Sequence, residues 1–211
     1  IEAAVKHCAA GKFRNAGQVC ISPTRFFIEE PVYDEFIKSF KSHVEAINVG
    51  DGLDSKSTMG PLVADRRLEV MEDFISDAIS SGGEVISGGG RGQSPGSFFE
   101  PTLIRDVPDT AKIMIEEPFG PVAPSASFSS IDEIIERANS LPFGLASYAF
   151  TSNPRTSQIL KSEIESGMLA INSMHIHSVE TPFGGLKHSG YGYEGSLSLI
   201  HISEPTRPRL I

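Results

Sequence analysis

Cys20 is the residue of this chain whose type and surroundings most clearly suggest chemistry. It ends the segment FRNAGQVC at residues 13–20, in which Ala16 and Gly17 let the backbone pass close to a ligand. A thiol there could attack a carbonyl carbon, and Gln18 and the amides around Cys20 could donate hydrogen bonds to the resulting oxyanion. The alternative is a buried structural cysteine, a common fate of free thiols. The local sequence leaves both interpretations open.

Cys8 serves as an internal comparison. It lies in an alanine-rich segment at residues 3–10, without a glycine turn, and we expect it to pack in a core. Two cysteines make no disulfide framework, which favours a reducing compartment such as the cytoplasm, with the mitochondrial matrix also possible. The helical pattern at Ile1 and the lack of a starting methionine suggest that the chain is cut from a longer protein.

Two further motifs follow Cys20 along the chain. EEPFGP occupies residues 116–121, and PFGGLKHSGYG occupies residues 182–192. Together with residues 15–20, and in this order, they resemble the NAD(P)-dependent aldehyde dehydrogenases, from residue 1 to about Ser196. The stretches 16–24 and 180–185 look most like succinate-semialdehyde dehydrogenase-type members.

The resemblance implies that an aldehyde is oxidised to a carboxylic acid with NAD or NADP. Cys20 matches the family's nucleophile: its thiolate adds to the aldehyde, the tetrahedral thiohemiacetal passes hydride to the nicotinamide, and water hydrolyses the thioester. Asn15 is expected to support this loop beside the oxyanion hole. Because a free thiol has a pKa near about 8.5, the site must favour the thiolate or supply a base.

The resemblance also assigns residues to the cofactor and the substrate. Glu117 and Phe119 match positions at the nicotinamide end of the cofactor, where a carboxylate can accept both ribose hydroxyls and an aromatic ring can pack beside the nicotinamide. Without the family match, Glu117 would be a solvated loop acid. Ser178 and Phe183 are expected near the substrate tunnel, with Ser178 a candidate to hold a substrate carboxylate and Phe183 equally compatible with core packing.

No metal site is expected. His175 and His177 lie two residues apart, but no carboxylate or cysteine nearby completes a ligand set, so we expect exposed loop histidines. The glycine-rich stretch at residues 88–92 lacks the following Lys-Ser/Thr of a phosphate loop and opens no helix, so we expect a surface hairpin loop.

Alternating strand and helix signals predict an α/β fold. The resemblance specifies a parallel-sheet catalytic domain, with the Rossmann-like cofactor domain largely missing. Pro124 should place its strand at a sheet edge or bulge, and Asn172 should lie at the carboxyl end of a buried strand, where such sheets bind ligands. We expect strands at 25–28, 84–87, 98–104, 122–128, 146–151 and 168–171, and helices at 1–10, 31–47, 68–79, 131–138 and 153–164.

We divide the chain into three parts. Residues 1–19 are the end of a cofactor-binding domain with the nucleophile loop, residues 20–196 are the catalytic domain, and residues 197–211 are a non-native tail. The last assignment rests on the match between LSLIHISEPTR at residues 197–207 and the translation of a widely used sequencing-library adapter. The alternative is a genuine C-terminal arm.

Several parts of the family's machinery are absent from this sequence. These are the general-base glutamate of an upstream Glu-Leu-Gly-Gly motif, the glycine-rich pyrophosphate turn, the lysine at the adenosine ribose and the asparagine of the oxyanion hole. We therefore expect the chain alone to be inactive, and its parent to be a full enzyme that forms a dimer or tetramer. A CoA-acylating aldehyde dehydrogenase and an inactive, truncated interaction domain remain as alternatives.

The composition restricts the partners. A net charge of -9 argues against nucleic acid and anionic membranes as partners. The sequence has no run of about 18 apolar residues, so we expect no membrane-spanning helix. The resemblance to aldehyde dehydrogenases implies a small-molecule aldehyde as the partner.

Overall fold

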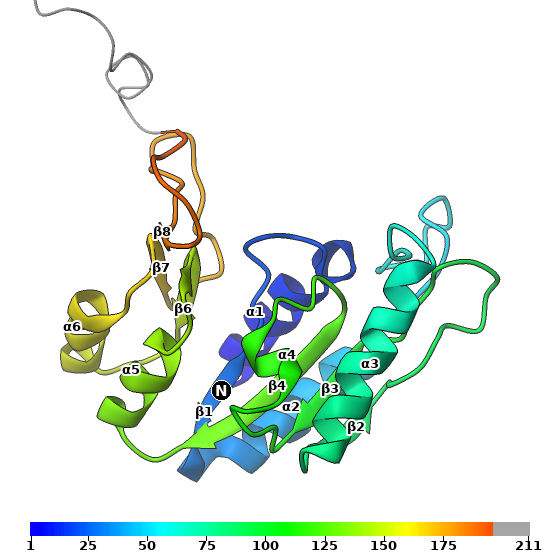
Figure 1. Cartoon of the computed structure of the whole chain (residues 1–211), viewed down its shortest axis with the longest axis horizontal. Helices are drawn as coiled ribbons and strands as arrows, with labels where there is room; N and C mark the ends of the chain where they lie inside the picture. The colour runs from blue at the N-terminus through cyan, green and yellow to red at the C-terminus, as the bar shows by residue number, and fades with distance from the viewer. Residues whose placement is uncertain (196–211) are drawn as a thin grey trace, which may run out of the picture. The chain divides into compact units, whose positions relative to one another are not determined.

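The structure is a computed structural model, and it describes residues 1–195. These residues belong to two compact units, Ile1–Arg137 and a second unit that begins at Ala138. Figure 1 shows the chain from blue at its start to orange at the end of the described part. The division falls inside the stretch that we assigned to one catalytic domain, and the predicted tail at 197–211 lies outside the described residues.

The first unit is built on a four-stranded sheet. Its strands are β1 (Phe26–Glu29), β4 (Val122–Phe128), β3 (Thr102–Arg105) and β2 (Glu84–Ser87), in that spatial order. β4 is parallel to both β1 and β3, while β2 is antiparallel to β3. The prediction of an α/β fold is thereby confirmed, but the sheet is mixed and only mostly parallel, because β2 runs antiparallel to β3.

Pro124 does not mark an edge strand, contrary to our expectation. β4 is an inner strand, and Pro124 pairs with Ile104 of β3. The pairing of β4 with β1 begins only at Ser125, so β4 has a single neighbouring strand at the level of Pro124. A residue without an N–H is tolerated there because only one ladder needs hydrogen bonds. The predicted strand at 98–104 is also shortened, since β3 begins at Thr102, after Pro101.

Four α-helices accompany this sheet: α1 (Glu2–Phe13), α2 (Tyr33–Glu45), α3 (Arg66–Ser80) and the short α4 (Lys112–Ile115). Short 3-10 turns, η1 (Arg14–Gly17) and η2 (Glu30–Val32), follow α1 and precede α2. α2 ends at Glu45, before Ile47, where we expected this helix to end, and Ile79, the last residue of the helix expected at 68–79, is 53% exposed.

An aromatic cluster joins α1, α2 and β1. The ring of Phe40 lies 6.3 Å from Phe13, 5.2 Å from Phe26 and 5.7 Å from Phe36, and Phe40 is fully buried. Each such ring contributes about 1.5–3 kcal/mol on burial. The cluster fixes the last turn of α1, from which the segment with Cys20 departs.

The second unit contains β5 (Phe143–Gly144), β6 (Ala146–Ala149), α6 (Pro154–Glu163), β7 (Met168–Ile171) and β8 (Leu186–Lys187), and α5 (Ile131–Asn139) crosses the boundary. β6 and β7 are parallel, and β5 pairs antiparallel with β8. Asn153 caps α6, because its side chain accepts hydrogen bonds from the amides of Arg155 and Thr156. We expected β7 to be a buried strand. Met168 and Ala170 are buried, whereas the two residues that alternate with them are only partly buried.

Candidate active site

The segment that carries Cys20 has an unusual backbone. Asn15, Ala16 and Gly17 are consecutive left-handed residues, with φ values of 52°, 53° and 71°. A left-handed alanine is disfavoured by its Cβ, so the surroundings must hold this turn. Part of that support is local, because Asn15 Nδ2 donates a 3.0 Å hydrogen bond to the carbonyl of Gln18. This contact supports the loop role expected for Asn15.

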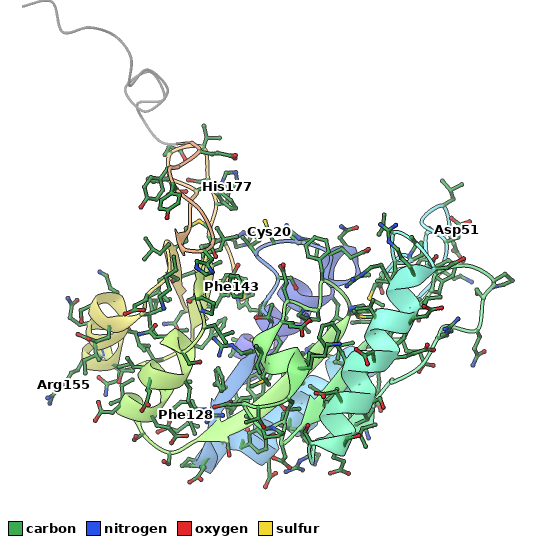
Figure 2. The ribbon with its side chains drawn as sticks, in the orientation of Figure 1. Cys20, Asp51, Phe128, Phe143, Arg155 and His177 are labelled. Atoms are coloured by element: carbon green, nitrogen blue, oxygen red, sulfur yellow. The ribbon has the colours of Figure 1, made fainter. Side chains whose placement is uncertain are left out.

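The two cysteines lie in opposite surroundings. Both are free thiols; Cys20 is exposed on the loop after η1, whereas Cys8 is buried in α1. Figure 2 shows the sulfur of Cys20 on a loop at the surface of the first unit. Burial raises the pKa of the Cys8 thiol to about 12, so this group stays protonated. Of the two thiols, only Cys20 is placed to meet a solute.

Gly17 brings the first two sequence motifs into contact. A Cβ added to Gly17 would lie 2.2 Å from the carbonyl oxygen of Gly120, closer than any real side chain allows. Gly17 also needs its left-handed φ, so two independent requirements select glycine at this position. As a result, the turn before Cys20 packs directly against the loop that carries Glu117 and Phe119.

The loop at residues 116–121 is held from its other side by α3. Arg67 donates hydrogen bonds to the carbonyls of Pro118 and Phe119. A Cβ added to Gly120 would lie 2.2 Å from Met71 Sδ, so this helix also packs against the loop. Phe119 has a left-handed φ of 43° and is 39% exposed. The ring is therefore presented to solvent on a constrained backbone.

The carboxyl group of Glu117 is partly desolvated although the residue as a whole is exposed. Desolvation raises the pKa of Glu117 above its ordinary value, and the positive charges of Lys12 and Arg67 oppose this rise. Lys12 lies in α1 and is 1% exposed. Its own burial lowers the pKa of Lys12 to about 7, and the charge of Glu117 works against that shift.

Gln18 has a role different from the one we expected. Its Nε2 donates to the carbonyls of Asn15 and Pro61, at 3.0 and 3.3 Å, and its Oε1 accepts a 2.8 Å bond from the amide of Val63. Because both amide hydrogens are used, the side chain has no donor left for an oxyanion. Gln18 instead ties the turn before Cys20 to the segment that leads into α3.

Lys12 contacts the Cys20 segment and Arg67 contacts the loop at 116–121, and the sequence motifs had singled out neither residue. A signal for Lys12 was present, since Val5, Cys8, Ala9 and Lys12 follow the spacing of a single helix face, and all four are buried. A lysine on a buried face calls for a charge partner. Arg67 had no such signal, because it contacts residues 51 and 52 positions further along the chain.

Ser178 and Phe183 lie in the second unit. Ser178 is exposed, and its amide donates a 2.9 Å bond to Thr181 Oγ1. Phe183 is half-buried, forms two backbone hydrogen bonds of 2.7 Å with Glu194, and contacts the ring of His177 edge-on at 5.5 Å. Asn172 follows the end of β7. Its Oδ1 accepts a hydrogen bond from the amide of Thr151 and its Nδ2 donates one to the carbonyl of Thr151, so the side chain joins two backbone segments.

The described part of the chain, residues 1–195, contains no group of three or more His, Cys, Asp or Glu side chains arranged to hold a metal ion. His175 and His177 are exposed loop residues, as expected. None of the helices within residues 1–195 has the length and apolar character needed to cross a membrane.

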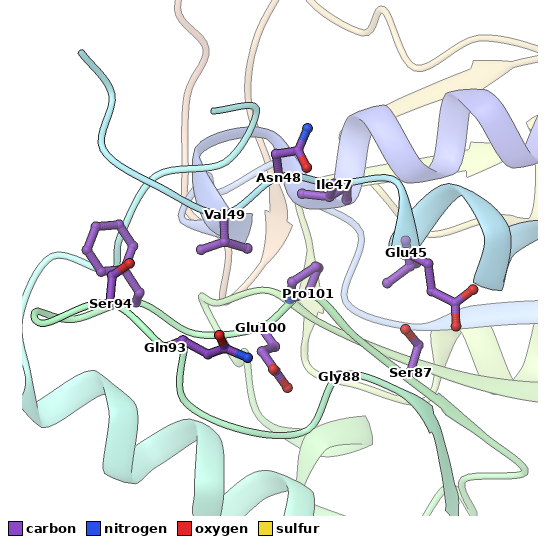
Figure 3. A pocket seen from close by; sticks show the side chains of 13 residues that line it. Glu45, Ile47, Asn48, Val49, Ser87, Gly88, Gln93, Ser94, Glu100 and Pro101 are labelled. Atoms are coloured by element: carbon purple, nitrogen blue, oxygen red, sulfur yellow. The ribbon is translucent and has the colours of Figure 1, made fainter. Parts of the chain in front are cut away.

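A pocket of about 460 Å³ lies in the first unit, between the end of α2 and the glycine-rich loop (Figure 3). Its walls include Glu45 and Glu100, and no lysine, arginine or histidine stands among its described lining residues. This charge does not suit a phosphate. The amides of Gly92 and Glu100 pair with the carbonyls of Phe98 and Gly90, which confirms a hairpin-like loop.

The fold and the site together define a mixed α/β protein in which an exposed thiol and a half-desolvated carboxylate lie on two interlocked loops. The family model described as "Aldehyde dehydrogenase family" matches residues 1–205. The chain belongs to the aldehyde dehydrogenase family.

Individual relatives share much of the sequence. The mitochondrial succinate-semialdehyde dehydrogenase of Rattus norvegicus is 40% identical over 197 residues, which are 93% of this chain and 38% of that protein. The 4-(hydroxymethyl)benzenesulfonate dehydrogenase TsaD1 of Comamonas testosteroni is 42% identical over 183 residues, or 87% of this chain and 38% of its own length. The crystal structure of succinate-semialdehyde dehydrogenase from Burkholderia pseudomallei matches with a TM-score of 0.90 and 39% identity, over 92% of this chain and 40% of that one. The chain thus spans about 40% of the length of the proteins it matches.

Proposed function

We propose that this chain is the catalytic-domain portion of an NAD(P)-dependent aldehyde dehydrogenase, with Cys20 as its nucleophile. The observation that carries the proposal is the packing of Gly17 on Gly120, which sets the segment of the exposed Cys20 thiol against the loop of Glu117 and Phe119. A nucleophile and a cofactor-binding loop must lie close together for hydride to leave the substrate carbon.

The chemistry assigned to the chain's own residues is limited and specific. The Cys20 thiolate forms a bond from Sγ to the aldehyde carbon, whose oxygen becomes an oxyanion, and the backbone amides beside Cys20 are its donors. Asn15 holds the turn in the conformation that exposes the thiol. With NAD(P) bound, the cofactor would accept the hydrogen of that carbon as hydride, which converts the adduct to a thioester. Water can then cleave the Sγ–acyl bond, releasing the acid and the Cys20 thiol.

The loop at 117–119 fits the ribose and nicotinamide of NAD(P). Glu117 offers a partly desolvated carboxylate that can accept two hydroxyl hydrogens, and Phe119 offers an exposed ring on a backbone that Arg67 holds. The bound cofactor would supply the hydride acceptor. A family structure of 3,6-anhydro-L-galactose dehydrogenase, described as a complex with NAP, has a TM-score of 0.89 and 38% identity to this chain.

Succinate semialdehyde is the substrate we propose. Several relatives carry that name, and a substrate with a carboxylate needs cationic or hydroxyl partners. Arg14, an exposed cation six positions before Cys20, is the candidate in the first unit. The roles of Ser178 as a carboxylate partner and Phe183 as a tunnel wall, both in the second unit, rest on the family resemblance alone. The sulfonate in the name of the Comamonas relative is likewise an anion, which supports an anionic substrate class for this group.

The decisive experiment uses a full-length enzyme that contains this chain. Cys20→Ala should abolish the oxidation of succinate semialdehyde and leave NAD(P) binding nearly unchanged, because a covalent step is lost and not ground-state binding. Cys8→Ala is the matched control and should retain activity. Turnover of Cys20→Ala within tenfold of the wild type would exclude Cys20 as the nucleophile. Adding CoA to the assay distinguishes the acylating alternative, in which the product is an acyl-CoA.

A further inference from the structure

A cation of α3 holds the loop of Glu117 through its backbone. Arg67, in the first turn of α3, is half-buried and donates to two successive carbonyls of this loop, those of Pro118 and Phe119. The bond to Phe119 is 3.5 Å long. These carbonyls flank a left-handed, non-glycine residue, so Arg67 holds the one part of the loop whose backbone conformation is disfavoured.

Lys12, in α1, supports the neighbouring Cys20 segment. It is buried, and its carbonyl oxygen accepts a 3.2 Å hydrogen bond from Ser22 Oγ, two residues after Cys20. The same carbonyl lies 3.3 Å from where a Cβ of Gly17 would stand. The backbone of Lys12 therefore contacts the Cys20 segment both before and after Cys20. The charge of its side chain opposes the rise in the pKa of Glu117.

These contacts complete a closed ring of three segments. The Cys20 segment touches the 116–121 loop through Gly17 and Gly120, the loop touches α3 through Arg67 and Met71, and the segment before α3 returns to Gln18. A shift in any one segment must disturb the other two, because the segments are close-packed at Gly17 and Gly120 and no space remains for independent movement.

We propose that Arg67 is a positioning residue for Glu117: it fixes the backbone of the Glu117–Phe119 turn, and its positive charge favours the ionised carboxylate that can bind the ligand. The proposal rests on the assignment of Glu117 to the cofactor site. It extends the site to α3, a helix that contributes none of the residues of the three motifs.

Positioning differs from simple structural support in what it predicts for Glu117. A merely structural Arg67 would affect unfolding but leave the ionisation of a properly folded Glu117 unchanged. A cation that holds the carboxylate charged must, when neutralised, let the pKa of Glu117 rise further above its ordinary value. The desolvation that already raises this pKa would then be less opposed.

The first test is a carboxyl NMR titration of Glu117 in the 211-residue chain. Arg67→Met should shift the midpoint for Glu117 upward. Arg66→Met, which neutralises an exposed neighbour on the same helix, should leave it in place. Arg67→Lys keeps the charge but loses the forked donor, so it should preserve the midpoint while amide exchange at residues 118–121 accelerates. An unshifted midpoint in folded Arg67→Met would overturn the proposal.

The second test uses the full-length enzyme. Arg67→Met should raise the KM for NAD(P) at least several-fold with a smaller change in the KM for aldehyde, and Arg66→Met should change neither. Equal effects on both substrates would overturn the positioning role. The function of Glu117 itself is tested separately by Glu117→Gln: if that variant binds NAD(P) normally, the cofactor assignment fails, whatever the titration shows for Arg67.

Discussion

Cys8 and Cys20 carry the same thiol in two different surroundings. Cys8 lies on the buried face of α1, where the absence of water raises its pKa to about 12, while Cys20 stands on an exposed loop. Reactivity toward an electrophile requires both access and thiolate. The difference between the two residues therefore follows from position alone.

Brief treatment of the folded chain with iodoacetamide should modify Cys20 and spare Cys8. Mapping by mass spectrometry at a series of times would give the two rates, and urea should make them equal because it removes the burial of Cys8. Preferential labelling of Cys8 in the folded protein would contradict this assignment.

Lys12 should make the stability of the chain depend on pH. Its pKa falls from 10.5 to about 7 on folding, so between these values the unfolded state binds more protons and the free energy of unfolding rises with pH. The penalty for burying the charge is fully present below pH 7 and is relieved toward pH 10.

Urea unfolding of the wild type and of Lys12→Met at pH 7 and 9.5 measures this effect. The stability of the wild type relative to the variant should increase with pH, since methionine does not titrate. The comparison cancels the contributions of other groups that titrate in both proteins. A constant difference would mean that Lys12 is charged in the folded chain throughout this range.

At the scale of elements, the site depends on contacts between loops that no single element makes. The turn after α1, the loop before β4 and the start of α3 meet at Gly17, Gly120 and Arg67. Each element forms for its own local reasons, such as the apolar faces of α2 and α3. The site exists only where their ends come together.

Gly17→Ala should therefore disturb the site as well as the fold. The new Cβ would meet the Gly120 carbonyl at 2.2 Å in a left-handed conformation, and we expect a loss of about 1–3 kcal/mol in the free energy of unfolding. Gly52→Ala is the matched control, because no atom lies within 4 Å of its added Cβ and its φ is not left-handed. Urea unfolding and the alkylation rate of Cys20 measure the two consequences. Equal stability of the two variants would show that the 15–20 turn and the 116–121 loop do not interlock.

At the scale of the whole molecule, the chain matches about 40% of the length of its relatives. We expect the 211-residue chain alone neither to oxidise aldehydes nor to bind NAD(P) tightly, because a nucleophile and one end of a cofactor site do not position a hydride acceptor or activate water. Assays with NAD, NADP and succinate semialdehyde check this expectation. Turnover of about 1 per second or faster would show that the chain is sufficient.

The sequence by itself determined the kind and order of most elements, because apolar periodicity and turn residues act over a few neighbouring positions. Its motifs also singled out Cys20, Glu117 and Phe119. The position of Lys12, at helical spacing from apolar residues on the buried face of α1, could likewise have been recognised from the sequence. The expectation that Pro124 marks an edge strand was wrong, because the number of strands that flank β4 is decided by the assembly of the whole sheet and not by the sequence of β4.

Only the tertiary structure decided that Gln18 holds the segment before α3 and that Arg67 of α3 bonds the loop of Glu117. The bond from Arg67 to Pro118 joins residues 51 positions apart, and that from Val63 to Gln18 joins residues 45 apart. Contacts between residues so far apart in the sequence depend on how the helices pack on the sheet, and no local pattern of residues encodes that packing.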